Sequence, residues 1–294
     1  MDARPAPSIV EIASPFEGDR GRVKLLEPPD CNRRRLREAL RSGAYGKPFV
    51  LDEQGSRTLH FSRELVQSGM RVDDPCALDF AYTRDMMGFL LFVHEPRHVL
   101  VLGLGGGSLV KFCHRHLPTA RLTVVEIDPH VIAFRDEFRI PRDDARLTVR
   151  QDDAAEYVAH ASGNADVILM DAFDRDGLAP ELSARDFYAD ARSALARRGV
   201  LVANLVGDDR RRLAHLHRIE EAFDGNAILV PVEEDGNHIA FAFRDPRFEP
   251  RWRWIESRAG AMRKRYGLDF PRMAARLERS GKLGYLERAL RASR

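Results

Sequence analysis

The sequence has few cysteines and no long apolar run, and both absences restrict the class of protein. Its cysteines, Cys31, Cys76 and Cys113, are far apart and odd in number. They therefore match neither a disulfide framework nor the paired spacing of a zinc site. No apolar stretch approaches the roughly 20 residues that cross a bilayer, and no signal peptide is evident at the N-terminus. We expect a cytoplasmic protein with no membrane association.

Several motifs of catalysis and metal binding are also missing. Neither the G-x-S-x-G nucleophile elbow nor the G-K-[ST] end of a P-loop occurs. The pairs His114/His116 and His215/His217 are two residues apart on predicted helices. The two side chains of each pair therefore point to different sides of the helix. The sequence predicts no metal site.

The charge is unevenly distributed along an otherwise ordinary globular composition. Of 294 residues, 44% are hydrophobic and 31% charged, which fits one large domain or two modest ones. The net charge is only +2, yet residues 250–294 hold 13 Lys or Arg against four Asp or Glu. A basic tail can contact nucleic acid. Because Trp252, Trp254 and Phe270 are interleaved with these charges, we favour a helical face instead and expect no nucleic-acid partner.

The most informative stretch is residues 98–129. An apolar run ends at a glycine-rich turn, an amphipathic helical pattern follows, and a second apolar run ends in an acidic residue, Glu126. This order predicts strand, tight turn, helix and strand. Glycine allows positive φ and close approach of a ligand, and the helix N-terminus presents free N–H groups. We expect a ligand site at the four glycines of this turn, Gly103, Gly105, Gly106 and Gly107.

The spacing in this turn indicates which nucleoside is bound. Glu126, 23 residues after Gly103, can accept hydrogen bonds from both ribose hydroxyls. From Gly103 the pattern is G-x-G-G-G-S, so Ser108 replaces the last glycine of the dinucleotide fingerprint. That pattern is closer to the turn of class I S-adenosylmethionine proteins. A NAD-type fold and a glycine turn without ligand remain the alternatives.

Strand and helix patterns alternate through the rest of the chain. They predict an α/β Rossmann-like class I methyltransferase fold, a mostly parallel doubly wound sheet closed by an antiparallel pair at 227–232 and 238–243. We expect helices at 33–41, 73–93, 131–138 and 153–160, and one from Ser183 to a C-cap at Gly199. The expected domains are an N-terminal β-hairpin module (1–75), a nucleoside-binding catalytic domain (76–245) and a basic helical tail (246–294).

Carboxylates follow the predicted strands at the edge where such sheets bind ligands. Asp153 can accept a hydrogen bond from an adenine amino group or simply cap its helix, and Asp152 can take either role. Asp171 follows a largely apolar strand. A carboxylate there can hold an amine and accept its proton as it becomes a nucleophile. Asp174 either assists Asp171 or belongs to a turn.

The combined motifs resemble the spermidine synthase (polyamine aminopropyltransferase) family over residues 48–245. The segments that carry this resemblance are VLVLGLGGGSL, VVEIDP, DVILMDAFDRDGL and GVLVANL. The resemblance implies a homodimer that binds decarboxylated S-adenosylmethionine, transfers its aminopropyl group to a small-molecule amine and releases methylthioadenosine. It needs no metal.

The resemblance also implies individual roles. Glu126 would hold the ribose and Asp153 the adenine. Asp171 would orient the amine and act as base, with Asp174 beside it. Tyr82 and Gln67 would line the aminopropyl and acceptor side.

Three positions depart from the family pattern. The loop aspartate of the family is Gly106 here, its tyrosine-x-glutamate is Tyr82-Thr83-Arg84, and the proline after its second aspartate is Arg175. Lost carboxylates and an added cation should weaken binding of a polycation. Two alternatives therefore stay open. One is a methyltransferase whose intact S-adenosylmethionine has its carboxylate paired with Arg84. The other is a non-catalytic relative that binds a nucleoside or a partner.

Overall fold

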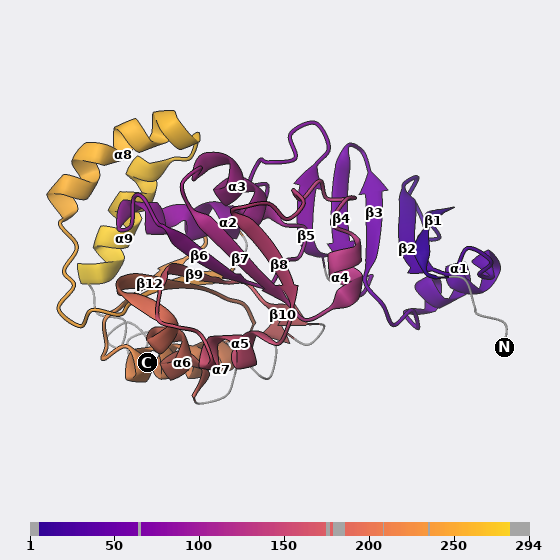
Figure 1. The fold of residues 1–294 in the computed structure, drawn as a ribbon. Coiled ribbons are helices and arrows are strands. Elements are labelled where there is room, and N and C mark those ends of the chain that lie inside the picture. Colours follow the sequence, from indigo (N-terminus) through magenta and orange to yellow (C-terminus); the bar gives the residue numbers. More distant parts are fainter. Residues whose placement is uncertain are drawn as a thin grey trace.

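The computed structural model describes residues 6–63, 66–174, 177–178, 186–207, 209–234 and 236–282. An N-terminal antiparallel sheet stands at one end of the molecule, and a larger sheet flanked by helices forms the rest (Figure 1). In the described part of the chain, no helix is both long and apolar enough to span a bilayer.

The larger sheet has the predicted mostly parallel topology. Its seven strands lie in the order β13-β14-β12-β9-β6-β7-β8. The run from β12 to β8 is parallel, whereas β14 pairs antiparallel with both β12 and β13. The bounds are β6 (His98–Leu102), β7 (Arg121–Glu126), β8 (Leu147–Gln151), β9 (Ala165–Met170), β12 (Leu195–Leu205), β13 (Ala227–Pro231) and β14 (His238–Phe243). The predicted fold class is confirmed.

The central strand β6 explains why helices cover both faces. All five of its residues are buried, as expected for a parallel strand between two helical layers. Val99 and Val101 join one core, and Leu100 and Leu102 join the other. The first core contains α2 (Ala81–Met86), the 3-10 helix η1 (Met87–Leu91), α3 (Ser108–His116), α4 (Pro129–Ala133), α8 (Trp252–Tyr266) and α9 (Phe270–Lys282). The second contains α5 (Ala154–Ala159), α6 (Phe187–Ala194) and α7 (Asp209–Ala222).

The N-terminal sheet has five antiparallel strands in sequence order. The hairpin expected around Gly55 joins β3 (Phe49–Glu53) to β4 (Ser56–His60) and is followed by β5 (Val66–Arg71). The pair β1 (Ser8–Ala13) and β2 (Arg22–Glu27) was not predicted, although both segments alternate apolar and polar residues. These two strands pack with α1 (Arg33–Ser42) in a small core of their own at the far end of the sheet.

The predicted helix end at Gly199 is wrong. Helix α6 ends at Ala194, and β12 begins at Leu195 with a shift in its register against β9 before Val200. A Cβ on Gly199 would lie 2.9 Å from the carbonyl oxygen of Ala165. The glycine therefore serves a close approach between strands rather than a helix cap.

Two other helices are shorter than predicted. The helix expected at 131–138 ends at Ala133, and turns continue to Arg139, whose φ is 52°. The helix expected at 73–93 is helical only from Ala81, first as α2 and then as η1. Met87, Leu90 and Leu91 of η1 are buried, so the apolar side chains of this segment face the core.

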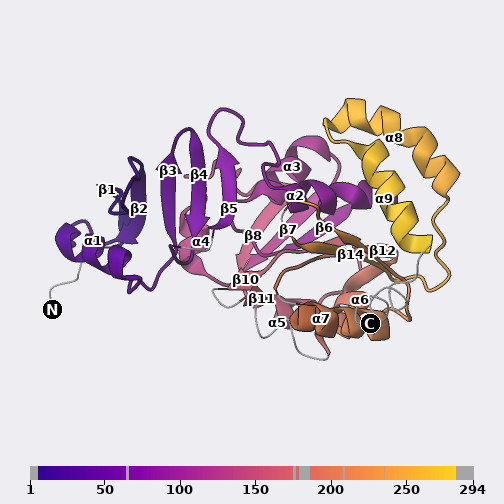
Figure 2. The ribbon, with the colours of Figure 1, turned by 180° about the vertical axis from the view of Figure 1, so that it is seen from behind.

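The described part of the basic tail is integrated into the first core. Helices α8 and α9 lie together at the end of the molecule opposite the N-terminal sheet (Figure 2). Their buried residues include Ile255, Met262, Phe270 and Leu277, so the basic side chains form the outer faces, as favoured from the sequence. Arg276 also pairs with Asp85 of α2 over 2.9 Å.

Candidate active site at the carboxyl edge of the sheet

The glycine turn after β6 lies directly against the end of β9. Gly103, Gly105 and Gly107 have φ of 93°, 50° and 68°. A Cβ on Gly103 would lie 2.4 Å from the carbonyl oxygen of Asp171, too close for any side chain. The backbone N–H of Asp171 in turn donates to the carbonyl of Leu102 over 2.9 Å. The turn and the catalytic candidate Asp171 are therefore held together by backbone contacts.

Strand β5 of the N-terminal sheet covers this turn. The Ser68 hydroxyl accepts a hydrogen bond from the N–H of Gly106 over 2.6 Å. A Cβ on Gly105 would lie 2.7 Å from Oε1 of Gln67, so the amide of Gln67 rests on that glycine. This Oε1 atom is buried and accepts no hydrogen bond from the residues that the structure describes. An orphaned acceptor at a glycine turn is what a ligand with hydrogen-bond donors would satisfy.

Glu126 ends β7 beside the same turn. Its carboxylate accepts hydrogen bonds from the N–H of Leu104 over 2.8 Å and of Asp128 over 2.9 Å. Burial raises the pKa of Glu126, while these N–H donors act against that rise. The two hydrogen bonds fix the carboxylate at the strand end, where a ribose would approach. Asp128 is the N-cap of α4, and its Oδ1 accepts a hydrogen bond from the N–H of His130 over 2.7 Å.

The adenine-side candidates lie one strand further along. Asp153 is the N-cap of α5, and its Oδ1 accepts from the N–H groups of Ala155 and Glu156. The capping role is therefore present, and Oδ1 alone carries it. The N–H of Asp152 donates to the carbonyl of Glu126 over 3.1 Å, which places the ends of β7 and β8 side by side.

Asp171 is the best-supported candidate for a catalytic group. It is half-buried, and its Oδ1 accepts a hydrogen bond from the Asn204 amide over 2.9 Å. The hydroxyl of Tyr82, a buried residue of α2, also donates to this carboxylate. Burial raises the pKa of Asp171 to about 6, against the lowering effect of these two donors. A carboxylate with this pKa can accept a proton near neutral pH.

The other two candidates, Arg84 and Asp174, are not shown to contact Asp171. Arg84 donates to the carbonyls of Leu78 and Asp79 and pairs with Glu234 over 2.9 Å, so its guanidinium is held by these groups. The structure thus does not bring Arg84 to Asp171. The backbone of Asp174 belongs to the short strand β10 (Phe173–Asp174), but its side chain lies outside the part that the structure describes, as do Arg175 and Ser183.

Sequence reasoning missed two polar residues of this site. Asn204 is a single amide near the end of the apolar run VLVANL, and its burial among apolar residues was the available signal. Its Oδ1 is buried and has no partner in the described part of the chain, and the same holds for Oε1 of Gln67. Ser68 had no signal beyond its place next to Gln67. Within the described residues, no group of three or more His, Cys, Asp or Glu could hold a metal ion.

Comparisons with known proteins agree with this geometry. The sequence model of the spermine/spermidine synthase domain matches residues 79–221. A polyamine aminopropyltransferase of Chromobacterium violaceum is 36% identical over 84% of this chain and 95% of its own length.

Two solved structures share the fold. A probable spermidine synthase from Corynebacterium glutamicum matches with a TM-score of 0.58 at 20% identity, covering 87% of each chain. Human methyltransferase-like protein 13 in complex with SAH matches with a TM-score of 0.55 at 26% identity, over 64% of this chain and 89% of that chain. With a 36% identical relative covered almost end to end, the chain belongs to the polyamine aminopropyltransferase (spermine/spermidine synthase) family.

Proposed function

We propose that the protein transfers an aminopropyl group from decarboxylated S-adenosylmethionine to an amine of a polyamine acceptor and releases methylthioadenosine. The observation that carries this proposal is the half-buried carboxylate of Asp171, held by Tyr82 and Asn204 beside the glycine turn. The relatives named polyamine aminopropyltransferase support it.

The co-substrate would lie along the carboxyl edge of the sheet. Glu126 would hold the ribose, Asp153 the adenine with Asp152 beside it, and the glycine turn would pass close to the nucleoside. The buried, unpartnered Oε1 of Gln67 fits this ligand because it can accept a hydrogen bond there.

Asp171 would supply the general base. The acceptor amine attacks the carbon next to the sulfonium, a C–N bond forms, and the C–S bond breaks with its electron pair going to sulfur. The amine proton passes to Asp171, whose raised pKa matches this task near pH 7. Tyr82 would orient that carboxylate, with Asp174 beside it.

The methyltransferase alternative is less well supported. It requires Arg84 to pair with the carboxylate of intact S-adenosylmethionine, but Glu234 already pairs with Arg84. It also requires free space at Gly106, where an added Cβ would lie 2.6 Å from the Ser68 hydroxyl and 3.0 Å from the ring of Phe138. The same ion pair removes the objection that Arg84 would repel a polyamine.

Calorimetric binding of decarboxylated and intact S-adenosylmethionine, followed by detection of methylthioadenosine with polyamine acceptors, tests the proposal. We expect preference for the decarboxylated form and acceptor-dependent product. Asp171→Asn should lower kcat by about 10²- to 10⁴-fold, as for loss of a general base, while co-substrate binding persists. Binding of the intact form alone, or unaltered turnover by Asp171→Asn, would overturn it.

We also propose that the protein is a cytoplasmic homodimer, as the family resemblance implies. Light scattering coupled to size-exclusion chromatography tests the oligomeric state, and a monomer mass at micromolar concentration would refute the dimer.

A further inference from the structure

A second cavity lies away from Asp171, on the face of the main sheet that carries α5 and α6. Its volume is about 570 Å³, within the range of small-molecule sites. Helix α5 has only six residues. It therefore leaves part of the edge strand β8 uncovered, and Thr148 and Arg150 of that strand are exposed.

The residues of β7 and β8 that face this cavity are polar, whereas β6 and β9 also contribute the apolar Leu100 and Ala165. The polar residues are Arg121 and Thr123 on β7 and Thr148 and Arg150 on β8. The residues between them, such as Leu122 and Val124, point into the first core. Because successive side chains of a strand point to opposite faces of the sheet, the apolar residues face the core and the polar residues of these two strands face the cavity. If the cavity face were only packed against a helix, we would expect apolar residues there.

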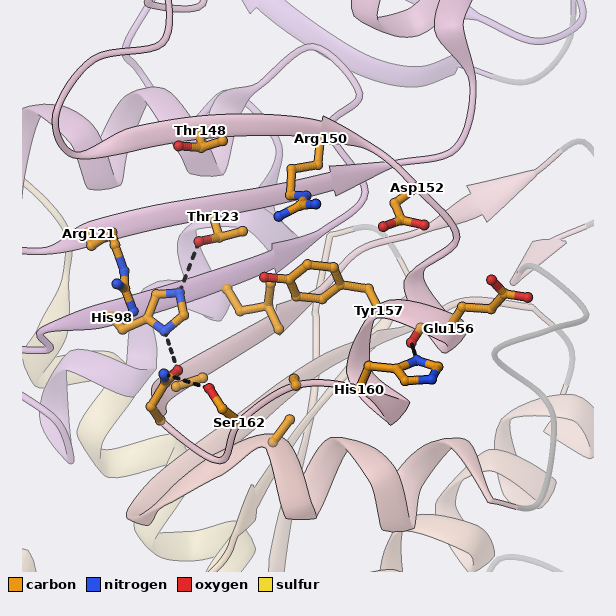
Figure 3. A pocket seen from close by; sticks show the side chains of 15 residues that line it. His98, Arg121, Thr123, Thr148, Arg150, Asp152, Glu156, Tyr157, His160 and Ser162 are labelled. Atoms are coloured by element: carbon orange, nitrogen blue, oxygen red, sulfur yellow. Dashed lines mark hydrogen bonds between the residues drawn. The ribbon is translucent and has the colours of Figure 1, made fainter.

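Charges of opposite sign line the two ends of the cavity. Figure 3 shows Arg121 and His98 at one end, Asp152 and Glu156 at the other, and Arg150 with Tyr157 between them. From the strand register, Arg150 lies about 13 Å beyond Arg121 along the strands at about 3.3 Å per residue. The cavity is therefore polarised along its length.

These charges have no partners among the described side chains. Arg121 and Arg150 form no ion pair there, and Arg150 contacts only the ring of Tyr157, at 5.7 Å. Asp152 accepts one hydrogen bond, from the N–H of Asp153, and meets no cation. The ring of His98 bridges Thr123 over 3.0 Å and Asn164 over 2.9 Å, and burial lowers its pKa, which disfavours a charge on the ring.

We propose that this cavity binds a small elongated zwitterion of the ω-amino carboxylate class. Its carboxylate would lie between Arg121 and Arg150, and its ammonium group would face Asp152 and Glu156. The hydroxyls of Thr148 and Tyr157 would contact the middle of the ligand. A molecule with one charge would leave one end of the cavity unsatisfied, and a short zwitterion could not reach both ends. The cavity shares Asp152 with the adenine side of the proposed co-substrate site, but the proposal does not require aminopropyl transfer itself.

Calorimetry with 6-aminohexanoate and 8-aminooctanoate tests the site. We expect both to bind at least about tenfold more tightly than glycine, hexanoate or hexylamine, a difference of about 1.4 kcal/mol. Arg121→Gln, Arg150→Gln and Glu156→Gln should each weaken binding by a similar factor. Arg253→Gln and Glu256→Gln, which change exposed charges on α8, are matched controls and should not.

Circular dichroism of each variant separates lost binding from lost folding. Absence of binding at millimolar concentrations, equal affinity for singly charged ligands, or full affinity in folded Arg121→Gln and Arg150→Gln would overturn the proposal. Loss of binding in Asp171→Asn would also overturn it, because the ligand would then occupy the carboxyl edge of the sheet instead.

Discussion

The side-chain amide of Asn204 donates a hydrogen bond to Oδ1 of Asp171 over 2.9 Å. The hydroxyl of Tyr82, which lies on α2, donates a second hydrogen bond to the same carboxylate. Hydrogen bonds to the ionised form lower the pKa of a carboxyl, whereas burial raises it. Asp171 therefore owes its pKa of about 6 to burial that outweighs two donors.

Removing the Asn204 donor should move the pH dependence of turnover. In Asn204→Leu, the pKa of Asp171 rises above 6 because one stabilising hydrogen bond is lost. The acidic limb of the profile of kcat/KM against pH should shift to higher pH, and the rate at pH 7 should fall by about tenfold. Tyr82→Phe should shift the limb in the same direction. An unchanged acidic limb in both variants would show that Asp171 does not control it.

The Asp171 carboxyl should also affect stability in a pH-dependent way. Its pKa is raised from 3.8 to about 6 by folding, so the folded state binds the proton more tightly. The wild-type protein should therefore lose stability as the pH rises from about 4 to about 6. Asp171→Asn should lack this loss. Urea unfolding of both proteins at pH 4.5 and 7.5 measures it, and parallel curves would contradict the assignment.

Restoring the family's loop aspartate should damage this chain. A Cβ at Gly106 would lie 2.6 Å from Ser68 Oγ and 3.0 Å from the ring of Phe138. Gly106→Asp should therefore lower the free energy of unfolding by about 1–3 kcal/mol, as for overpacking, and reduce turnover. Gly46→Asp, at an open position, is the control. A variant with unchanged stability and higher turnover would refute this steric argument.

The Arg84–Glu234 ion pair should matter little to catalysis. The Glu234 side chain is 65% exposed, and exposed pairs contribute about 0–1 kcal/mol. Arg84→Gln should thus keep turnover within about threefold of wild type. The alternative in which Arg84 holds the carboxylate of intact S-adenosylmethionine requires a loss of roughly tenfold or more in binding of that ligand. Calorimetric titration of decarboxylated and of intact S-adenosylmethionine into Arg84→Gln distinguishes these two expectations.

A buried lysine below the glycine turn gives a second pH effect on stability. Lys111 donates to the carbonyl of Phe138 over 2.9 Å, and burial lowers its pKa from 10.5 to about 8. Between these values the unfolded chain binds the proton and the folded chain does not. Stability should therefore rise as the pH increases from 8 to 10.5. Lys111→Met should remove that rise in urea unfolding at pH 8 and 10, with Lys264→Met on exposed α8 as control.

The sequence predicted the main sheet well because its parallel strands are short apolar runs followed by glycine or acid. The bounds expected for β14, 238–243, match the structure. Periodicity could not locate the end of α6, because the residues at 195–199 suit a helix and only contact with β9 makes them a strand. The strands β1 and β2 are not joined by a short turn, so no hairpin signal marks this pair in the sequence.

The candidate site was predictable where a side chain follows a strand, and hidden where a distant segment covers it. Glu126 and Asp171 could be assigned from their own positions in the sequence. That Asn204 donates to Asp171, and that Ser68 caps the N–H of Gly106, depends on strands that are remote in sequence. The domain boundaries at 75 and 245 stay predictions.

The ion pair between Asp85 and Arg276 has a consequence for how the enzyme is made. Both side chains are nearly buried, and Asp85 lies on the same short helix as Tyr82. A ribosome produces the glycine turn, Asp171 and Asn204 well before Arg276 emerges. Until then Asp85 lacks its ion pair with Arg276, and α2 lacks this contact with α9. We therefore expect catalytic competence only after α9 has been synthesised and has docked, because α9 contacts the short helix that carries Tyr82.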